Sequence, residues 1–520
     1  MTEPDLQYRP LTGAMPMRIA TVSEAQWTST AQAFADAGDR LVALWGSDRR
    51  DVDAACEGFV VYAAYAARDG LAVVRVLASN EPPEYPALST RYPSAVRMQR
   101  ALFDLLGVRA RSINDEISVD QRPWLRHAAW PADFFPLRRG GATRHFDTRQ
   151  ENYPFVAVAG DGVHEIPVGP IHAGIIEPGH FRFSVVGEKV LRLEQRLGYV
   201  HKGIDKLFDG MPLSQGHRLA GRVSGDSTVA YAWAYAMAAE AATRCVIPPR
   251  TEWLRALLLE RERVANHLGD LGALGNDAGL AFGLAQFSRL REQWLRVNSE
   301  VFGHRLLMDG IVPGGVATDL NSGGRAQIRQ QCLDVEKEVL RLRAIYDEHA
   351  GLQDRFQTTG IVTPELAARL GLCGLAGRAS GQAHDLRVDF PLPPYDRFDV
   401  KLAFDTRGDV AARVAVRFDE LAESLRLIRL IADEMPEGEV RIALPSIDSD
   451  SFGIGWVEGW RGEVMVALET DTLGRVRRCH CHDPSWQNWP LLEHAVLGNI
   501  VPDFPLINKS FNLSYAGHDL

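Results

Sequence analysis

Short apolar runs separated by polar turns dominate residues 1–136 of the chain. The run MRIATV (17–22) predicts a strand, and Ser23 follows it in the position of a helix N-cap. A second helix is expected over 93–106, because apolar residues recur there at helical spacing. Together these elements predict an α+β domain. Further strand-like runs in this part are RLVALW, GFVVYAAYAA and LAVVRVLA.

Longer helical periods fill the rest of the chain, from about residue 161 to 520. Between Thr251 and His267, leucine, valine and alanine side chains form one stripe, with arginine and glutamate opposite. This part is therefore predicted to be a mainly α-helical domain with a helix-bundle core and small β elements. The polar, glycine-containing stretch 137–160 is expected to be a linker. Similar helical patterns cover 285–305, 325–348 and 409–433.

Bulk properties narrow the class of protein. With 46% apolar and 24% charged residues, a net charge of −10 and a pI near 5.9, the chain has a globular composition that disfavours a nucleic-acid surface. Its longest apolar stretch, 228–242, contains Glu240 and is too short to span a bilayer, so a buried helix is expected there. No secretion signal is expected at the start of the chain, and the scattered cysteines suit a reducing compartment. Any membrane association would then depend on a partner.

Two polar features of the predicted helices have structural explanations. Asp409 and Arg413 are four residues apart, which is the spacing of an ion pair along a helix. His267 lies next to the apolar stripe of its helix, as a hydrogen-bonded core histidine does.

The row CHCH (479–482) places four possible metal ligands side by side. Side chains alternate faces along a strand, so Cys479 and Cys481 would point one way and His480 and His482 the other. Four ligands on opposite faces cannot surround one tetrahedral zinc. The residues alone therefore predict a half-buried structural strand and no local metal site.

Longer stretches resemble a known family. VGPIHAGIIEPGHFRFSVVGEKVLRLEQRLGYVHKGIDKL (168–207) and GRASGQAHDLRVDFP (377–391) resemble the large subunit of group 4 membrane-bound nickel–iron hydrogenases and the related 49-kDa-type subunit of complex I. YPSAVRMQRALFDLLGV (92–108) resembles the 30-kDa-type subunit of complex I. Because the resemblance covers nearly the whole chain, the chain looks like a fusion of these two subunits.

The family's metal-binding motifs are altered in this sequence. Active large subunits resembling this chain hold nickel and iron with R-x-C-G-x-C and D-P-C-x-x-C. Here RVSGDS keeps Arg222, but Ser224 and Ser227 stand at the cysteine positions, and DPSWQNW has Ser485 and Asn488. Thiolates bind soft transition metals, and a serine hydroxyl stays protonated near neutral pH. The resemblance therefore implies that the nickel–iron site has been vacated.

Other family roles map onto single residues. Complex I brings a histidine from a G-P-x-H hairpin and a tyrosine from the early motif to its quinone; the resemblance puts His172 at the first position and Gly225 at the second. It implies that Arg222 and Asp226 lie near a partner's iron–sulfur cluster or the acceptor, and that Glu177 is a proton-path carboxylate. Structural explanations stay open, with His172 bound to backbone, Arg222 in a salt bridge and Glu177 capping a turn or in an ion pair.

The resemblance implies a peripheral subunit on the cytoplasmic side of a membrane. Its partners would be a small subunit carrying a 4Fe–4S cluster, a membrane subunit and antiporter-like subunits. The chain would bind no metal itself and would line a cavity for quinone or another acceptor in an oxidoreductase that couples electron transfer to ion translocation. The alternative is a scaffold subunit without catalysis; an active nickel–iron hydrogenase is disfavoured.

Overall fold

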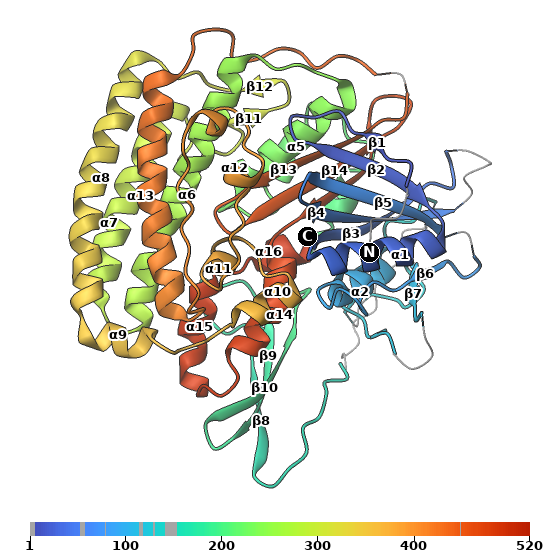
Figure 1. Ribbon diagram of the computed structural model, residues 1–520, viewed down its shortest axis with the longest axis horizontal. Coiled ribbons are helices and arrows are strands. Elements are labelled where there is room, and N and C mark those ends of the chain that lie inside the picture. The colour runs from blue at the N-terminus through green and yellow to red at the C-terminus, as the bar shows by residue number, and fades with distance from the viewer. Residues whose placement is uncertain are drawn as a thin grey trace.

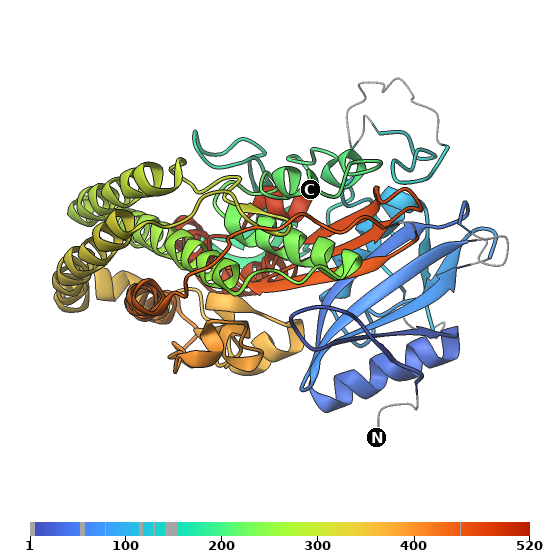
Figure 2. The same ribbon diagram turned by 90° about the horizontal axis from the view of Figure 1, so that it is seen from above.

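The computed structural model describes residues 6–52, 58–78, 80–113, 118–127, 130–140, 153–447 and 449–520 (Figure 1). Cys56 and residues 141–152 of the expected linker lie outside these ranges. Figure 2 shows the N-terminal sheet at one end of the molecule, the long helices at the other, and a second sheet between them.

A five-stranded sheet forms the N-terminal part, in the strand order β1-β2-β5-β4-β3. Strands β2 and β5 are parallel and the other neighbours are antiparallel. Helix α1 begins after Ser23, whose hydroxyl accepts from the Gln26 amide while the Gln26 side chain accepts from the Ser23 amide. This capping box confirms the predicted N-cap. The elements are β1 (Arg9–Pro10), β2 (Met17–Val22), α1 (Glu24–Ala37), β3 (Arg40–Asp48), β4 (Phe59–Ala67), β5 (Gly70–Ala78), β6 (Glu84–Pro86), α2 (Ala95–Leu106) and β7 (Arg109–Arg111).

Long helices build the opposite end of the molecule, where α6, α7, α8 and α13 pack into a bundle (Figure 1). Helix α5 runs through the centre and every one of its residues is buried, as expected of the apolar stretch. The predicted fold class, an α+β part followed by a mainly helical part, is confirmed. These helices are α5 (Thr228–Thr243), α6 (Pro249–Asp277), α7 (Ala281–Phe302), α8 (Ser322–Glu348) and α13 (Val410–Glu434). No helix of the described residues combines the length and apolar character that crossing a bilayer requires.

A three-stranded antiparallel sheet, in the order β13-β14-β15, lies against α5. It comprises β13 (Phe452–Glu458), β14 (Glu463–Thr470) and β15 (Val476–His482). Strand β15 carries the CHCH row, and the His480 ring stacks on Trp45 of β3, 5.3 Å between centroids. Cys479 and Cys481 are fully buried, and both histidines are buried too. The row is thus a strand, but the expected half-burial is wrong, because the N-terminal sheet covers its other face.

The remaining segments position the site. A three-stranded sheet extends away from the body and its β8–β9 connection is the G-P-x-H hairpin; the C-terminal helices fold back beside it (Figure 1). These elements are β8 (Val163–Val168), β9 (His180–Val186), β10 (Lys189–Arg196), α14 (Ser485–Ala495), α15 (Phe504–Phe511) and α16 (Tyr515–Asp519). Shorter elements are α3 (Ile204–Leu207), α4 (Gly216–Ala220), β11 (Ile311–Val312), β12 (Gly315–Val316), α9 (Ala350–Phe356), α10 (Pro364–Leu370), α11 (Gly374–Arg378), α12 (Leu386–Asp389) and the 3-10 turns Tyr395–Arg397 and Val501–Asp503.

The two polar features of the helices have different outcomes. Asp409 is the N-cap of α13 and accepts from the Ala412 amide at 2.8 Å, while Arg413 donates to the Ser510 hydroxyl at 2.8 Å. The expected ion pair between them is therefore wrong, because the cap turns Asp409 towards the backbone. His267 is fully buried and its Nε2 lies 2.9 Å from Glu420, which confirms a hydrogen-bonded core histidine.

Candidate functional site

The early and late motifs meet at the C-terminal segment of the chain. The Ser224 hydroxyl lies 3.0 Å from the Ser514 hydroxyl, and the Ser514 amide donates to the Ser485 hydroxyl at 2.9 Å. Ser514 also caps α16 by accepting from the Gly517 amide at 2.8 Å. Ser224, Ser485 and Ser514, here called the serine cluster, are all buried. The fold therefore brings one residue of each altered motif to a common place.

Arg461, in the turn between β13 and β14, holds the other end of the early loop. Its guanidinium donates to Asp226 Oδ1 at 2.9 Å and to the Ser227 hydroxyl at 3.1 Å. Its Nε donates to the Asn512 carbonyl. Burial alone would raise the pKa of Asp226, but the charge and hydrogen bonds of Arg461 lower that pKa to about 2. Asp226 is thus a fixed anion near neutral pH.

The Asp-Pro turn is anchored by neutral donors. Asp483 Oδ2 accepts from the Tyr231 hydroxyl and its Oδ1 from the Ser485 amide, each at 2.8 Å. Asn488 faces Cys373: its amide donates to the Cys373 carbonyl and its oxygen accepts from the Cys373 amide, both at 3.2 Å. Asn488 therefore binds backbone and does not join the serine cluster.

These donor groups are a poor match for nickel and iron. The altered positions present hydroxyls and an amide, and each is engaged in the hydrogen bonds just described. The Cys373 thiol beside Asn488 is buried, and burial raises its pKa, which disfavours the thiolate. Within the described part of the chain, no three His, Cys, Asp or Glu side chains are grouped to hold a metal ion.

Two predicted site residues of the G-P-x-H hairpin, His172 and Glu177, contact α16. His172 Nδ1 lies 3.2 Å from the Pro170 carbonyl, and its Nε2 lies 3.5 Å from the Tyr515 hydroxyl. Glu177 accepts from the Ala516 amide at 2.9 Å. Because Ser514 caps the same short helix, the consecutive residues 514–516 connect the hairpin to the serine cluster.

Tyr515 is a site residue that the sequence did not indicate. Its ring packs on Trp489, with 4.8 Å between centroids, and it is 5% exposed. Burial raises the pKa of its phenol. A single aromatic residue in an aromatic-rich tail gives no signal that it will contact a hairpin far upstream.

Arg222 and Asp226 do not share partners, although both were expected near one cofactor. Arg222 is exposed, and its guanidinium makes a bidentate pair with Asp309, one contact measuring 2.8 Å. Hydrogen bonding to Asp309 raises the pKa of Arg222 further above its ordinary value. Gly225, at the position of the complex I tyrosine, is exposed, and a Cβ there would meet nothing closer than 3.6 Å. The early loop thus has Arg222 and Gly225 at the surface and Asp226 held by Arg461.

Glu262 of α6 is a second residue that the sequence did not indicate. Its carboxylate accepts from the Val229 and Ala230 amides, at 2.7 and 3.2 Å, at the N-terminus of α5. Asn266, one turn further along α6, donates to the Asp226 carbonyl at 2.7 Å. Burial raises the pKa of Glu262 to about 8, against the lowering effect of the two amides. A carboxyl group that titrates near neutral pH therefore lies behind the early loop.

The chain is similar to known proteins over most of its length. Two family models match the chain: "Respiratory-chain NADH dehydrogenase, 30 Kd subunit" over 20–146 and "Respiratory-chain NADH dehydrogenase, 49 Kd subunit" over 277–451. Formate hydrogenlyase subunit 5 of Escherichia coli K12 is 30% identical over 492 residues, covering 93% of this chain and 85% of that protein. Hydrogenase-4 component G of the same strain is 31% identical over 484 residues, covering 92% and 83%.

Two further matches cover about two thirds of the chain. The carbon monoxide-induced hydrogenase of Rhodospirillum rubrum is 32% identical over 352 residues, covering 67% of this chain and 97% of that protein. One polypeptide in the solved structure of the membrane-bound sulfane sulfur reductase, described as an archaeal respiratory membrane complex, superposes with a TM-score of 0.65 at 24% identity. The match covers 69% of this chain and 99% of that polypeptide, which supports the fold alone.

Fold and motifs together define a hydrogenase-like, complex I-like oxidoreductase subunit. The chain belongs to the family of formate hydrogenlyase subunit 5 and hydrogenase-4 component G, with 30-kDa-type and 49-kDa-type complex I sequences fused in one polypeptide.

Proposed function

We propose that the chain is the peripheral subunit of a respiratory membrane complex related to complex I and to membrane-bound hydrogenases. In this proposal it lies on the cytoplasmic side of the membrane, against a small subunit with a 4Fe–4S cluster, a membrane subunit and antiporter-like subunits. It lines the site where a quinone-type acceptor takes electrons from that cluster. The observation that carries the proposal is the contact of His172 with Tyr515, next to the serine cluster.

The chemistry required of this chain is hydrogen bonding and proton supply. Reduction of a quinone to a hydroquinone takes two electrons, from the partner's cluster, and two protons. His172 would donate a hydrogen bond or a proton to one acceptor oxygen, a role that imidazole side chains often fill in active sites. Tyr515 would orient the imidazole and supply the phenol that is missing at Gly225. Glu177, bonded to the Ala516 amide, would hold α16 in place.

The proposal excludes hydrogen chemistry by this chain. At the cysteine positions of the two motifs, where active nickel–iron large subunits have thiolates, this chain has hydroxyl and amide groups. These groups are engaged in hydrogen bonds within the protein. Elemental analysis of the purified complex is therefore expected to give iron from the partner subunits and no nickel. Nickel in a one-to-one ratio with the chain would overturn this part of the proposal.

A second candidate function is a scaffold that transmits conformational change and has no substrate. The observation in its favour is that Arg222 and Glu177 are engaged with Asp309 and the Ala516 amide, as structural residues are. It predicts that electron transfer in the complex does not depend on His172.

The test compares two histidine variants in the assembled complex. His172→Ala is expected to abolish electron transfer that a quinone analogue inhibits. His164→Ala is the matched control, because His164 is exposed in the adjoining strand β8 and its ring, among the described residues, hydrogen-bonds to the Gly162 carbonyl two positions away. If both variants retain inhibitor-sensitive transfer at the level of the unmodified complex, the acceptor site is elsewhere and the scaffold function is favoured.

A further inference from the structure

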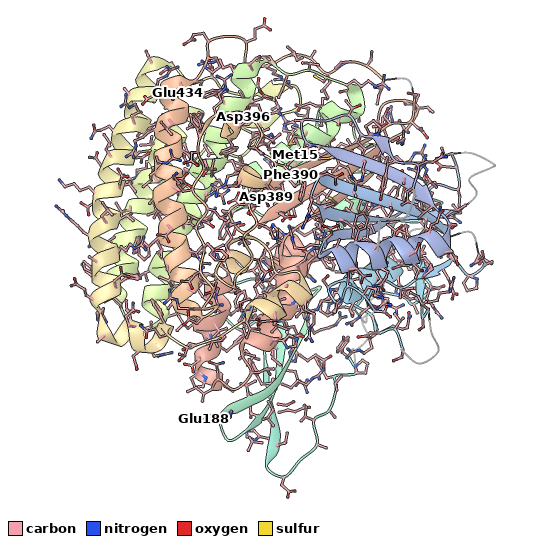
Figure 3. All side chains as sticks on the ribbon, in the orientation of Figure 1. Met15, Glu188, Asp389, Phe390, Asp396 and Glu434 are labelled. Atoms are coloured by element: carbon pink, nitrogen blue, oxygen red, sulfur yellow. The ribbon has the colours of Figure 1, made fainter. Side chains whose placement is uncertain are left out.

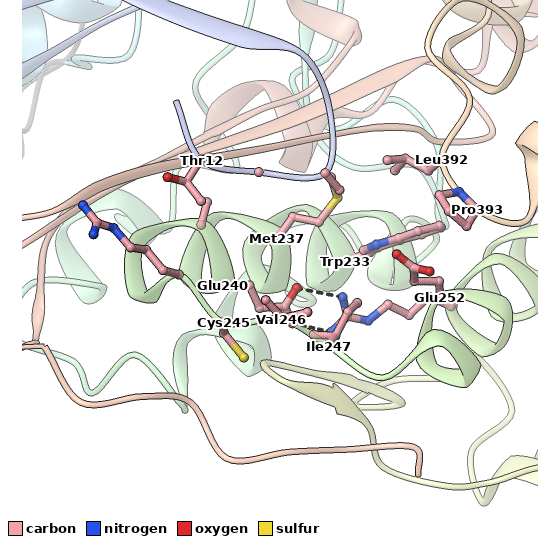
Figure 4. A pocket seen from close by; sticks show the side chains of 15 residues that line it. Thr12, Trp233, Met237, Glu240, Cys245, Val246, Ile247, Glu252, Leu392 and Pro393 are labelled. Carbon is pink, nitrogen blue, oxygen red and sulfur yellow. Dashed lines mark hydrogen bonds and ion pairs between the residues drawn. The ribbon is translucent and has the colours of Figure 1, made fainter. Parts of the chain in front are cut away.

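A cavity lies between the N-terminal segment and the C-terminal end of α5. Its volume is about 250 Å³, and it is roofed by Thr12, Gly13 and Ala14 (Figure 4). The floor and walls come from α5, from the loop that follows it and from the start of α6. The apolar lining includes Met237, Ile247, Leu392 and Pro393.

Two polar groups of this lining lack a protein partner. Trp233 is 3% exposed, yet its indole N–H has no acceptor among the residues that the structure describes. The Glu252 carboxylate, partly buried, likewise has no hydrogen bond or ion pair within the described ranges. Both groups face the cavity, where water serves them until a ligand replaces it.

The other charges of the lining are already balanced or solvated. Arg255 is fully buried and donates to both oxygens of Glu240, at 2.6 and 3.0 Å, and this pair is drawn in Figure 4. Glu240 also accepts from the Gly314 amide at 2.8 Å. Arg244 is exposed to solvent, where water and salt weaken its field. With two arginines and two glutamates the lining carries no net charge, and within the described residues Glu252 is its carboxylate without a hydrogen bond or ion pair.

We propose that this cavity is a binding site for a small primary amine that also carries a hydrogen-bond acceptor. The ammonium group donates to the Glu252 carboxylate, and the acceptor oxygen takes the Trp233 indole N–H. The hydrocarbon part of the ligand packs on Met237 and Leu392. Because the cavity is slightly smaller than sites for drug-sized ligands, the ligand is limited to a few carbon atoms.

Two further observations support a cationic ligand. Burial raises the pKa of Glu252, and the neighbouring Asp396 and Glu240 carboxylates raise it further against Arg255. An ammonium group would relieve this repulsion. At its inner end the cavity shares Trp233 and Leu392 with a hollow of only about 10 Å³, which Met15 and Phe390 also line; both are labelled in Figure 3. A ligand would therefore enter from the solvent side, under the Thr12–Ala14 roof.

The experiment is a binding titration of the full chain with 5-amino-1-pentanol, followed by thermal shift and by saturation-transfer NMR. Saturable binding is expected in roughly the millimolar range, as befits so small a molecule. The neutral analogue 1,5-pentanediol and the acceptor-free pentylamine are both expected to bind more weakly, by about tenfold or more.

Variants locate the site. Glu252→Gln is expected to weaken the binding of 5-amino-1-pentanol at least about tenfold. Trp233→Phe removes the indole donor while keeping an aromatic ring. Glu188→Gln is the control, because Glu188 is an exposed carboxylate at the tip of the β9–β10 hairpin (Figure 3). Absence of saturable binding, equal binding of the diol, or binding unchanged in both cavity variants would overturn the proposal and leave a cavity that holds only water.

Discussion

The Tyr515 hydroxyl lies 3.5 Å from His172 Nε2, although 343 residues separate the two in sequence. The contact places a phenol next to the hairpin histidine in a chain whose early motif has glycine at the expected tyrosine position. Since Ser514, the neighbour of Tyr515, also bonds Ser224 and Ser485, the C-terminal segment ties the hairpin to both altered motifs. The C-terminal segment is therefore as much a part of the site as the motifs themselves.

Tyr515→Phe tests this contact without removing the ring that packs on Trp489. Quinone-dependent electron transfer in the complex is expected to fall by about tenfold or more, because His172 loses its side-chain partner and the site loses a phenol. The melting temperature is expected to stay within a few degrees. Tyr85→Phe is the matched control, since the Tyr85 hydroxyl is buried in the N-terminal part and has no hydrogen-bond partner among the described residues. Equal activity of the two variants would remove Tyr515 from the acceptor site.

Arg222 of the early loop and Arg461, which holds that loop from the β13–β14 turn, should differ in their effect on stability. Arg461 is buried and bonds Asp226, Ser227 and the Asn512 carbonyl, so Arg461→Ala is expected to lower the free energy of unfolding by about 2 kcal/mol or more. Arg222 pairs with Asp309 at the surface, and Arg222→Ala is expected to change the free energy of unfolding by less than about 1 kcal/mol. Urea denaturation followed by circular dichroism gives both values. A larger loss for Arg222 than for Arg461 would contradict the assigned roles.

Local periodicity was sufficient to predict the long helices and the main strands, and long-range contacts explain part of what it missed. The capping box at Ser23 and the buried helix over 228–242 depend on residues a few positions apart, so both could be predicted. The alternation of the CHCH row could be predicted too, but its burial on both faces depends on Trp45 of a distant strand. Arg461 and Tyr515 lie in unremarkable stretches, and only the folded chain places them at the motifs.

Glu262 should make stability depend on pH. The folded pKa of about 8 lies above the ordinary value of 4.5, because the carboxyl group is buried. Between these two values the unfolded chain has lost a proton that the folded chain retains, so unfolding becomes more favourable as pH rises, by at most about 1.4 kcal/mol per pH unit. Glu262→Gln should remove this dependence and gain stability relative to the unmodified chain from pH 5 to pH 8.

The measurement is the free energy of unfolding of both proteins at pH 5, 6.5 and 8. Glu188→Gln, an exposed change, should track the unmodified chain at every pH. If the difference between Glu262→Gln and the unmodified chain does not grow with pH, the carboxyl group is ionised in the folded protein and the two α5 amides outweigh its burial.

The close approach of α5 to β13 depends on glycine. A Cβ built on Gly455 would lie 1.9 Å from the Ala234 carbonyl oxygen, and one on Gly453 would lie 2.1 Å from that of Ala238. Backbone atoms cannot yield as a flexible side chain does, so Gly455→Ala must push the sheet away from the helix. We expect it to lower the free energy of unfolding by about 1–3 kcal/mol, as overpacking of a core does. Because α5 begins at the early loop and Tyr231 of α5 bonds Asp483, the displacement should also reduce acceptor-dependent electron transfer.

Gly174→Ala is the control, since a Cβ there meets nothing within 4 Å and the change should leave stability unchanged. Equal stability of the two variants would show that sheet and helix can separate without loss, and that their contact does not position the motifs.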